Sequence, residues 1–228
     1  MIHCGSRGLG HQVAKEYSNQ FKSIMNKYNI SIPDNNLACV PLESSEGQQY
    51  FQAMNCAANY AFANRQLLLH KTRQVFADVF QTKPKKLGLN LVYDVTHNMA
   101  KKEGTKLVHR KGATRSFENQ PVIIGGSMQT PSYLLLGTKK AEELTFGSTS
   151  HGAGRSMSRT QAKQQKQGQQ LQKEIANQGI TVKTASFSNL AEEGRYAYKD
   201  INEVINSIDK SGISKPIAKF QPIGNIKG

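Results

Sequence analysis

The sequence predicts an α+β fold in which long helices come first and short strands follow. Apolar residues recur at three- and four-residue steps over residues 10–28, which is typical of an amphipathic helix, and the pattern stops before Pro33. A second, longer helix is expected over residues 45–80. Beyond Pro84 the apolar runs become short and are separated by Gly, Lys and polar turns, a pattern typical of strands.

Each later element rests on a local pattern of the same kind. Small residues along one side of the second helix would let another backbone approach closely; they are Ala53, Ala57, Ala58 and Ala61. No internal repeat or linker divides the chain, so a single domain is expected over residues 1–228. The expected strands are 89–95, 107–109, 122–124, 133–136 and 180–182, and the expected later helices are a glutamine-rich 161–178, interrupted by Gly168, and 198–208.

The composition indicates a basic, folded protein. Its 228 residues hold 30 Lys and Arg against 16 Asp and Glu, a formal net charge of +14, and no block of five like charges occurs. With 37% apolar residues the chain can bury a core, so wholesale disorder is excluded. A folded surface of positive potential favours polyanions, above all nucleic acid. The alternative is a basic domain without such a partner.

Several classes of protein are not expected. No window approaches the roughly 18 apolar residues of a membrane span. The first residues lack the basic and apolar regions of a secretory signal, so a cytoplasmic location is expected, or a nuclear one in a eukaryote. Three cysteines without a C-x-x-C pair argue against a disulfide scaffold and a zinc finger.

Four unusual segments fall at the ends of expected strands: residues 3–8, 93–98, 125–128 and 150–155. Strand ends deliver side chains to clefts, so their histidines and glycine turns suggest one shared site. The glycines would let backbone N–H groups approach a phosphate, although tight turns are the simpler explanation. His151, followed by Arg155 and Arg159, could attack a phosphoryl group. His3 and His97 suit a metal such as manganese or zinc, although single histidines at strand ends are often structural.

Longer stretches carry a family resemblance. The sequence resembles the C-terminal portion of the RtcB-type RNA-splicing ligases over essentially the whole chain. The matching stretches, in the family's order, are HCGSRGLGHQVAKEY, YDVTHNMAKKE, VHRKGATRSF, PVIIGGSMQTPSYLLLGT, FGSTSHGAGRSMSR, YKDINEV and the closing IKG.

The resemblance implies a role for each matching residue. His151 would be the nucleophile that accepts guanylate, and His3 and His97 would be manganese ligands. Arg7 and Arg159 would hold the phosphate of the RNA end, and Tyr198 would lie near the nucleotide. The residues that match the guanylate pocket are Asn98, Gly125, Gly126, Ser127, Met128, Ser132, Gly152, Ala153, Gly154 and Lys227.

The implied activity is a GTP- and manganese-dependent RNA ligase for tRNA splicing or RNA repair. It would join a 2′,3′-cyclic phosphate or 3′-phosphate end to a 5′-hydroxyl end through a guanylylated histidine. The family uses two manganese ions and GTP as cosubstrate, and its partners are RNA and an archease-type activator, with no membrane.

The chain departs from the family pattern in one important respect. Full-length members carry an upstream half with further metal ligands in D-x-x-C and G-N-H motifs, and neither motif occurs in this sequence. The expectation is therefore an N-terminally truncated RtcB-like domain, and an inactive or partial RNA-binding fragment stays open as the alternative. A lysine-nucleophile ligase using Lys111 is disfavoured, because the sequence around Lys111 is not a K-x-D-G element.

Overall fold

The computed structural model describes residues 1–228, and the chain divides into two compact units. Unit 1 comprises Met1–Asp94 and Ile226–Gly228, and unit 2 comprises Val95–Asn225. Long helices occur together with four small sheets of two or three strands, so the predicted α+β class is confirmed. None of the helices combines the length and the apolar character needed to cross a membrane.

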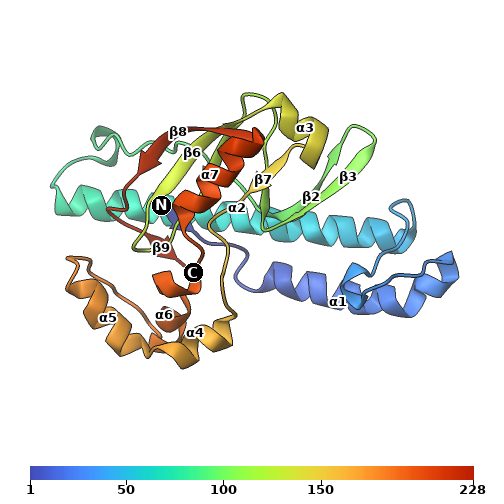
Figure 1. Ribbon diagram of the computed structural model, residues 1–228, viewed down its shortest axis with the longest axis horizontal. Coiled ribbons are helices and arrows are strands. Elements are labelled where there is room, and N and C mark those ends of the chain that lie inside the picture. The colour runs from blue at the N-terminus through green and yellow to red at the C-terminus, as the bar shows by residue number, and fades with distance from the viewer. The chain divides into compact units, whose positions relative to one another are not determined.

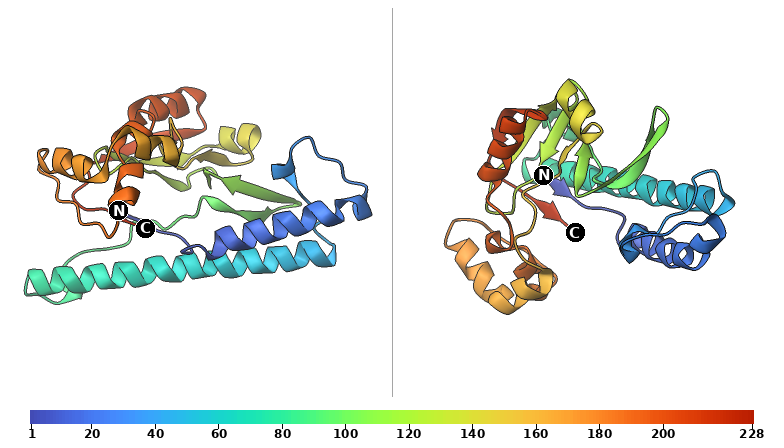
Figure 2. Two further views of the ribbon diagram at one scale, coloured as in Figure 1. Left: turned by 90° about the horizontal axis from the view of Figure 1, so that it is seen from below. Right: turned by 45° about the vertical axis from the view of Figure 1, so that its right-hand side comes forward.

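Two helices dominate unit 1, and the sequence predicted both. Helix α1 (Leu9–Ile24) continues as the 3-10 helix η1 (Met25–Tyr28), and α2 spans Ser45–Val79. Figure 2 shows α1 and α2 side by side and antiparallel. Ala57 is buried, and a side chain at Gly10 would meet its Cβ at 3.7 Å, so small residues allow the close approach.

The two ends of the chain pair with each other in unit 1. Strand β1 (Ile2–His3) lies parallel to β9 (Ile226–Lys227), with His3 in register with Lys227. Two further 3-10 helices complete the unit, η2 (Asn35–Leu37) and η3 (Pro84–Lys86).

Unit 2 is built from three sheets and five helices (Figure 1). Strands β2 (Asn98–Glu103) and β3 (Lys106–Lys111) form an antiparallel hairpin, and β4 (Ala113–Arg115) pairs with β7 (Ser148–Ser150). The third sheet has the order β5-β6-β8. The remaining elements are β5 (Pro121–Ile124), β6 (Ser132–Gly137), α3 (Lys139–Thr145), α4 (Arg159–Gln165), α5 (Gly168–Ala176), α6 (Phe187–Glu192), η4 (Arg195–Ala197), α7 (Ile201–Ser211) and β8 (Ser214–Phe220).

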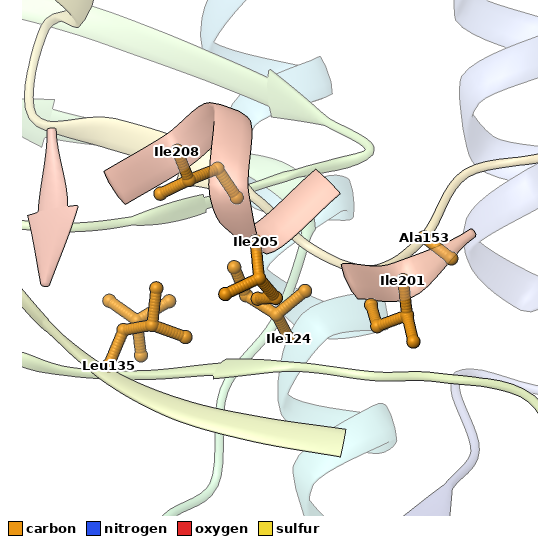
Figure 3. Packing of buried hydrophobic residues seen from close by; sticks show 7 residues of the cluster. Ile124, Leu135, Ala153, Ile201, Ile205 and Ile208 are labelled. Carbon is orange, nitrogen blue, oxygen red and sulfur yellow. The ribbon is translucent and has the colours of Figure 1, made fainter. Parts of the chain in front are cut away.

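The main core of unit 2 lies between α7 and the third sheet. Three isoleucines at helical spacing on α7, Ile201, Ile205 and Ile208, pack against Ile124 of β5 and Leu135 of β6 (Figure 3). Ile124 and Leu135 are fully buried. A second cluster joins α5 to α6 and consists of Leu171, Ile175 and Leu190. Together the two clusters fix the elements that carry the glycine turns.

Two predicted strands are wrong. Residues 89–95 join no sheet, and Leu91 and Val92 are largely exposed, so the apolar run has neither a partner strand nor a core. Residues 180–182 pack against the second cluster, but the carbonyl of Val182 accepts a hydrogen bond from the Gln172 side chain instead of joining a ladder. The predicted interruption of the glutamine-rich helix at Gly168 is confirmed, since α4 ends at Gln165 and α5 begins at Gly168.

The sequence patterns do not predict β2, β4, α3, β7, α6 or β8 of unit 2, and they place the start of α7 too early. Strand β8 contains Pro216, which is tolerated because β8 is an edge strand with a register shift opposite Leu134 and Leu135. Helix α7 starts at Ile201 instead of residue 198, because the Asp200 side chain caps it by accepting the Asn202 N–H. Strand β2 is polar, and no apolar alternation marks it.

Candidate functional site

Two of the three predicted histidines meet where two strand pairs join. His97 immediately precedes β2, and His151 immediately follows β7. The Gly112 N–H, between β3 and β4, donates to the His97 carbonyl at 2.9 Å, which ties the two segments together. The imidazole centroids of His97 and His151 lie 4.4 Å apart, with the rings tilted by 33°. Unit 2 therefore brings together side chains 54 positions apart in the chain.

Gly112 also fixes the chemistry of His151. The Nδ1 atom of His151 lies 2.6 Å from the Gly112 carbonyl oxygen. Because a carbonyl oxygen can only accept, Nδ1 carries the proton, and in the neutral ring the lone pair is on Nε2. Gly112 has a φ of 67°, and an added Cβ would lie 3.4 Å from the His151 ring, so this position favours glycine on two grounds. Sequence reasoning missed Gly112, although it lies within the VHRKGATR stretch.

The end of β5 holds the backbone of His151 from a second direction. Gly125 and Gly152 form an isolated parallel bridge, in which the Gly125 N–H donates to the His151 carbonyl at 3.2 Å and the Ala153 N–H donates to Gly125 at 3.1 Å. An added Cβ on Gly152 would lie 2.9 Å from the Gly125 carbonyl oxygen. The glycines at this crossing are thus required for close approach of the two segments.

The loop after β5 is held by its own hydroxyl groups. The Gly126 N–H donates to Ser132 Oγ at 3.2 Å, the Ser127 N–H donates to Thr130 Oγ1 at 2.6 Å, and the Gln129 N–H donates to Ser127 Oγ at 3.2 Å. Ser127 is buried, and Met128 packs against the second core cluster. These groups rigidify the loop.

Several groups of the predicted guanylate pocket already form contacts within the protein. The N–H groups of Gly125, Gly126 and Ala153 already donate within the protein, whereas those of Gly152 and Gly154 donate to no protein acceptor. The Ala153 side chain belongs to the main core, and the Asn98 Oδ1 atom accepts the Gly112 N–H at 3.2 Å.

The two predicted arginines of unit 2 differ in how firmly their side chains are held. Arg155 is fixed: its guanidinium lies 5.1 Å from the Tyr198 ring centroid, and Nη2 donates to the Glu192 carbonyl at 2.8 Å. The Arg159 side chain is 71% exposed, and its Nε atom lies 3.0 Å from Glu192 Oε2. Because Lys163 also contacts Glu192, at 2.6 Å, an incoming phosphate could replace that carboxylate as the partner of Arg159.

The neighbouring hairpin adds positive charge and one neutral imidazole. Burial lowers the pKa of Lys101, and the nearby positive charges of Arg115 and Arg110 lower it further, while Glu103 opposes them. Burial also lowers the pKa of His109, against an opposing hydrogen bond to the Leu107 backbone. His109 is thus held toward its neutral form.

The remaining predicted residues lie in unit 1. His3 and Lys227 are register partners in the β1–β9 pair, and the Gly228 N–H donates to the His3 carbonyl at 3.3 Å. The Arg7 Nη1 atom lies 3.7 Å from the sulfur of buried Cys4, which also accepts from Asn64 at 3.1 Å. These residues form a second candidate set, and a single site shared by all three histidines stays a prediction.

The side chains of this chain do not make up a complete manganese site. Manganese favours carboxylate, carbonyl and water oxygens in an octahedral arrangement, so two imidazoles could be only part of its ligand set. Within residues 1–228, no group of three or more His, Cys, Asp or Glu side chains is close enough to hold an ion. His97 has His151 as its imidazole neighbour, and His3 is in unit 1. A metal centre using either residue would need additional ligands.

Comparison with known proteins assigns the family. The family model for the tRNA-splicing ligase RtcB matches residues 1–228. The tRNA-splicing ligase RtcB of Methanococcus maripaludis is 48% identical to the whole chain, which spans 52% of that relative, and the one of Archaeoglobus fulgidus is 46% identical, again with 52% covered. The protein of the same name from Pyrococcus abyssi is 47% identical, with 27% covered. The chain spans about half the length of the first two relatives, and it belongs to the RtcB family of tRNA-splicing ligases.

Proposed function

We propose that this chain carries the guanylate-accepting part of an RNA ligase that uses GTP and joins RNA ends in tRNA splicing or RNA repair. The observation that carries the proposal is the hydrogen bond between His151 Nδ1 and the Gly112 carbonyl. It leaves the lone pair on Nε2, the nitrogen a histidine nucleophile needs, and the carbonyl dipole stabilises the positive charge that develops on the ring.

The first proposed step is attack of His151 Nε2 on the α-phosphorus of GTP. A nitrogen–phosphorus bond forms while the bond from that phosphorus to the bridging oxygen breaks, and pyrophosphate leaves. The N–H groups of Gly152 and Gly154 donate to no protein acceptor, so they are the backbone donors proposed for the phosphate oxygens. Asn98, Ser127 and Lys227 are proposed to contact the remainder of the nucleotide.

Two transfers complete the proposed reaction. An oxygen of the RNA 3′-phosphate attacks the bound phosphorus, so the nitrogen–phosphorus bond breaks and the imidazole becomes neutral again. The RNA 5′-hydroxyl then attacks the activated 3′-phosphate, loses its proton and expels GMP. Arg159, exposed beside one carboxylate, and Arg7 are the proposed ligands of the RNA phosphates.

His3 and His97 are the manganese ligands that we propose for this chain. The remaining ligands would have to come from groups other than the side chains of this chain. An archease-type activator is a proposed partner, and the cytoplasm, or the nucleus in a eukaryote, is the proposed location.

The decisive experiment measures label on the protein after incubation with manganese and GTP labelled at the α-phosphate. Because the side chains of this chain do not complete a manganese site, the test is run with the upstream half of a family member supplied in trans. Under these conditions the unmodified chain is expected to retain acid-labile label, as a phosphoramidate should, and His151→Ala is expected to retain none at any manganese concentration. His70→Ala, which removes an exposed histidine on α2, is the matched control and should label normally. Label retained by His151→Ala would contradict the assignment.

The second candidate function is RNA binding without chemistry, favoured by the net charge of +14. In that case no label is retained by any variant, and RNA affinity still falls with salt, with a logarithmic slope of about −0.7 per neutralised phosphate for single strands. His151→Ala should change that affinity less than about threefold, because arginines supply most of the phosphate attraction.

A further inference from the structure

Arg110 is a buried cation outside the set of predicted site residues. It lies on β3 and is 6% exposed. Its Nη1 and Nη2 atoms lie 2.7 and 2.8 Å from the two carboxylate oxygens of Glu103, in a bidentate pair across the hairpin. The two opposite charges neutralise each other, which burial of a guanidinium requires.

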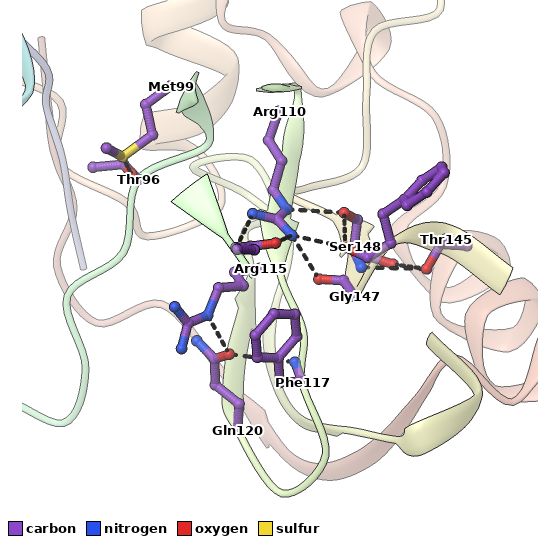
Figure 4. Close-up of polar contacts among 11 residues, drawn as sticks. Thr96, Met99, Arg110, Arg115, Phe117, Gln120, Thr145, Gly147 and Ser148 are labelled. Atoms are coloured by element: carbon purple, nitrogen blue, oxygen red, sulfur yellow. Dashed lines mark hydrogen bonds and ion pairs between the residues drawn. The ribbon is translucent and has the colours of Figure 1, made fainter. Parts of the chain in front are cut away.

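The other donors of Arg110 reach the start of β7 (Figure 4). Nε donates to Ser148 Oγ at 2.8 Å, and Nη2 donates to the carbonyls of Phe146 and Gly147 at 2.8 and 3.1 Å. Phe146 and Gly147 both have left-handed backbones, with φ of 51° and 59°. Arg110 thus holds three consecutive residues in a turn that is costly for Phe146.

The register of the β4–β7 ladder, which follows this turn, is only weakly determined by the ladder's own contacts. It pairs three residues of β4 with three of β7, and its central partners are Thr114 and Thr149. Both threonines are buried, and neither hydroxyl has a hydrogen-bond partner. A shift of such a short ladder by one residue would turn every side chain to the opposite face, and a shift by two would move the strand end by about 6–7 Å.

We propose that Arg110 is a positioning residue, which fixes the register of β7 and thereby places His151 for guanylate transfer. Arg110 holds the first residue of β7, Ser148, and Gly112, two positions beyond Arg110, holds His151 just after the last. Both ends of β7 are therefore fixed by one short segment, residues 110–112. This inference rests on the proposed function for its catalytic consequence, but the geometry can be tested without GTP.

The primary variant is Arg110→Lys, which keeps the charge beside Glu103 but lacks the planar fork that reaches the three other acceptors. Formation of protein-bound guanylate is expected to slow about 100-fold, the loss typical of a reacting group misplaced by 1 Å. Ser148→Ala, which removes one acceptor, should slow it less and serves as the second variant if Arg110→Lys is poorly folded. Ser214→Ala is the matched control: it breaks a buried hydrogen bond to the Ser116 side chain but leaves the Ser116 N–H, which donates to Gly147, and all Arg110 contacts in place. It should leave the rate within about twofold of the unmodified chain.

The structural readout is the nitrogen NMR spectrum of labelled histidine at a fixed alkaline pH, with His151 assigned from His151→Ala. In the unmodified chain and Ser214→Ala, the proton is expected on Nδ1. In Arg110→Lys the signal should shift toward a mixture of tautomers. If both variants that alter the Arg110 contacts fold and keep the Nδ1 proton and the rate, the proposal is overturned. If the tautomer changes but even the unmodified chain takes no label, the positioning role stands and the proposed function fails.

Discussion

The two units differ in how firmly backbone hydrogen bonds hold their candidate histidines. In unit 2, His97 and His151 follow or precede strands whose ends are joined by hydrogen bonds to Gly112 and Gly125. In unit 1, His3 and Lys227 depend on a pair of two-residue strands. Val122, Ile124 and Leu135 of unit 2 are 0% exposed, whereas the most buried apolar residue of unit 1, Ala57, keeps 4%.

This difference has a consequence for function. A site whose backbone is fixed by several hydrogen bonds loses its conformational entropy during folding rather than during binding. Its groups are therefore already oriented when a ligand arrives. His151 meets this condition, because its ring and its carbonyl are each hydrogen-bonded. His3 is held by a ladder of only two residue pairs, and so short a ladder opens at low free-energy cost.

The largest expected effect comes from the core beneath the unit 2 site. Ile124→Ala should lower the free energy of unfolding by about 2–5 kcal/mol, because a fully buried side chain is replaced by a cavity directly before Gly125. Hydrogen exchange read by mass spectrometry should accelerate across β5, β6 and α7. Equal acceleration in α1 and α2 would show that the two units do not differ in the way described.

Much of the fold could be predicted from the sequence, where the signal is local and repeated. Residues 45–80 carry a long helical pattern, and the helix observed is Ser45–Val79. The failures arise where pairing decides the outcome. Residues 89–95 are as apolar as a strand but find no partner, and β8 is a strand in spite of Pro216 because its position at the sheet edge spares the missing N–H.

The candidate site shows the same division. The histidines are distinctive in the sequence because each follows or precedes an expected strand, and His97 and His151 do come together. Gly112 and Arg110 were not identified as their supports, because their roles depend on which strand ends meet. Hydrophobic periodicity does not encode which strand ends meet, although the K-G-A sequence at residues 111–113, between β3 and β4, is an unusual break.

The second-largest expected effect comes from disturbing the close packing of α1 against α2 in unit 1. Ala57→Leu should destabilise the helix pair by about 1–3 kcal/mol, because the added atoms must enter the narrow contact between α1 and α2. Ala63→Leu adds the same atoms at an exposed position of α2 and should be nearly neutral. Denaturant unfolding followed by helical circular dichroism would measure both, and equal effects would argue against close packing at Ala57.

A smaller, local effect is expected from removing Ile226–Gly228. The deletion takes away β9, so the Met1 and His3 carbonyls lose the N–H groups of Ile226 and Gly228. Amide exchange in residues 1–5 should accelerate at least about tenfold, which corresponds to about 1.4 kcal/mol of local opening. The tautomer of His151 should not change. A change there would mean that unit 2 does not orient its histidine by itself.

The smallest expected effect is a pH dependence that belongs to unit 1. The Tyr28 hydroxyl donates to the Glu46 carboxylate at 2.8 Å. This hydrogen bond, together with those from the backbone N–H of Glu46 and from the Lys27 and Ser45 side chains, lowers the pKa of the Glu46 carboxyl from 4.5 to about 2. Because the pKa is lower in the folded protein, the stabilisation is fully present above about pH 4.5 and is lost as the pH falls toward 2.

Replacing the carboxylate should remove this component. Glu46→Gln is expected to be less stable than the unmodified chain at neutral pH, and the difference should shrink on acidification to about pH 2, because the native carboxyl is then protonated as well. Glu43→Gln removes the carboxylate three residues earlier and serves as the control. Thermal unfolding of the helical signal at several pH values measures the three proteins. A stability gap between Glu46→Gln and the unmodified chain that stays constant with pH would show that the hydrogen bonds to Glu46, rather than its charge, stabilise the start of α2.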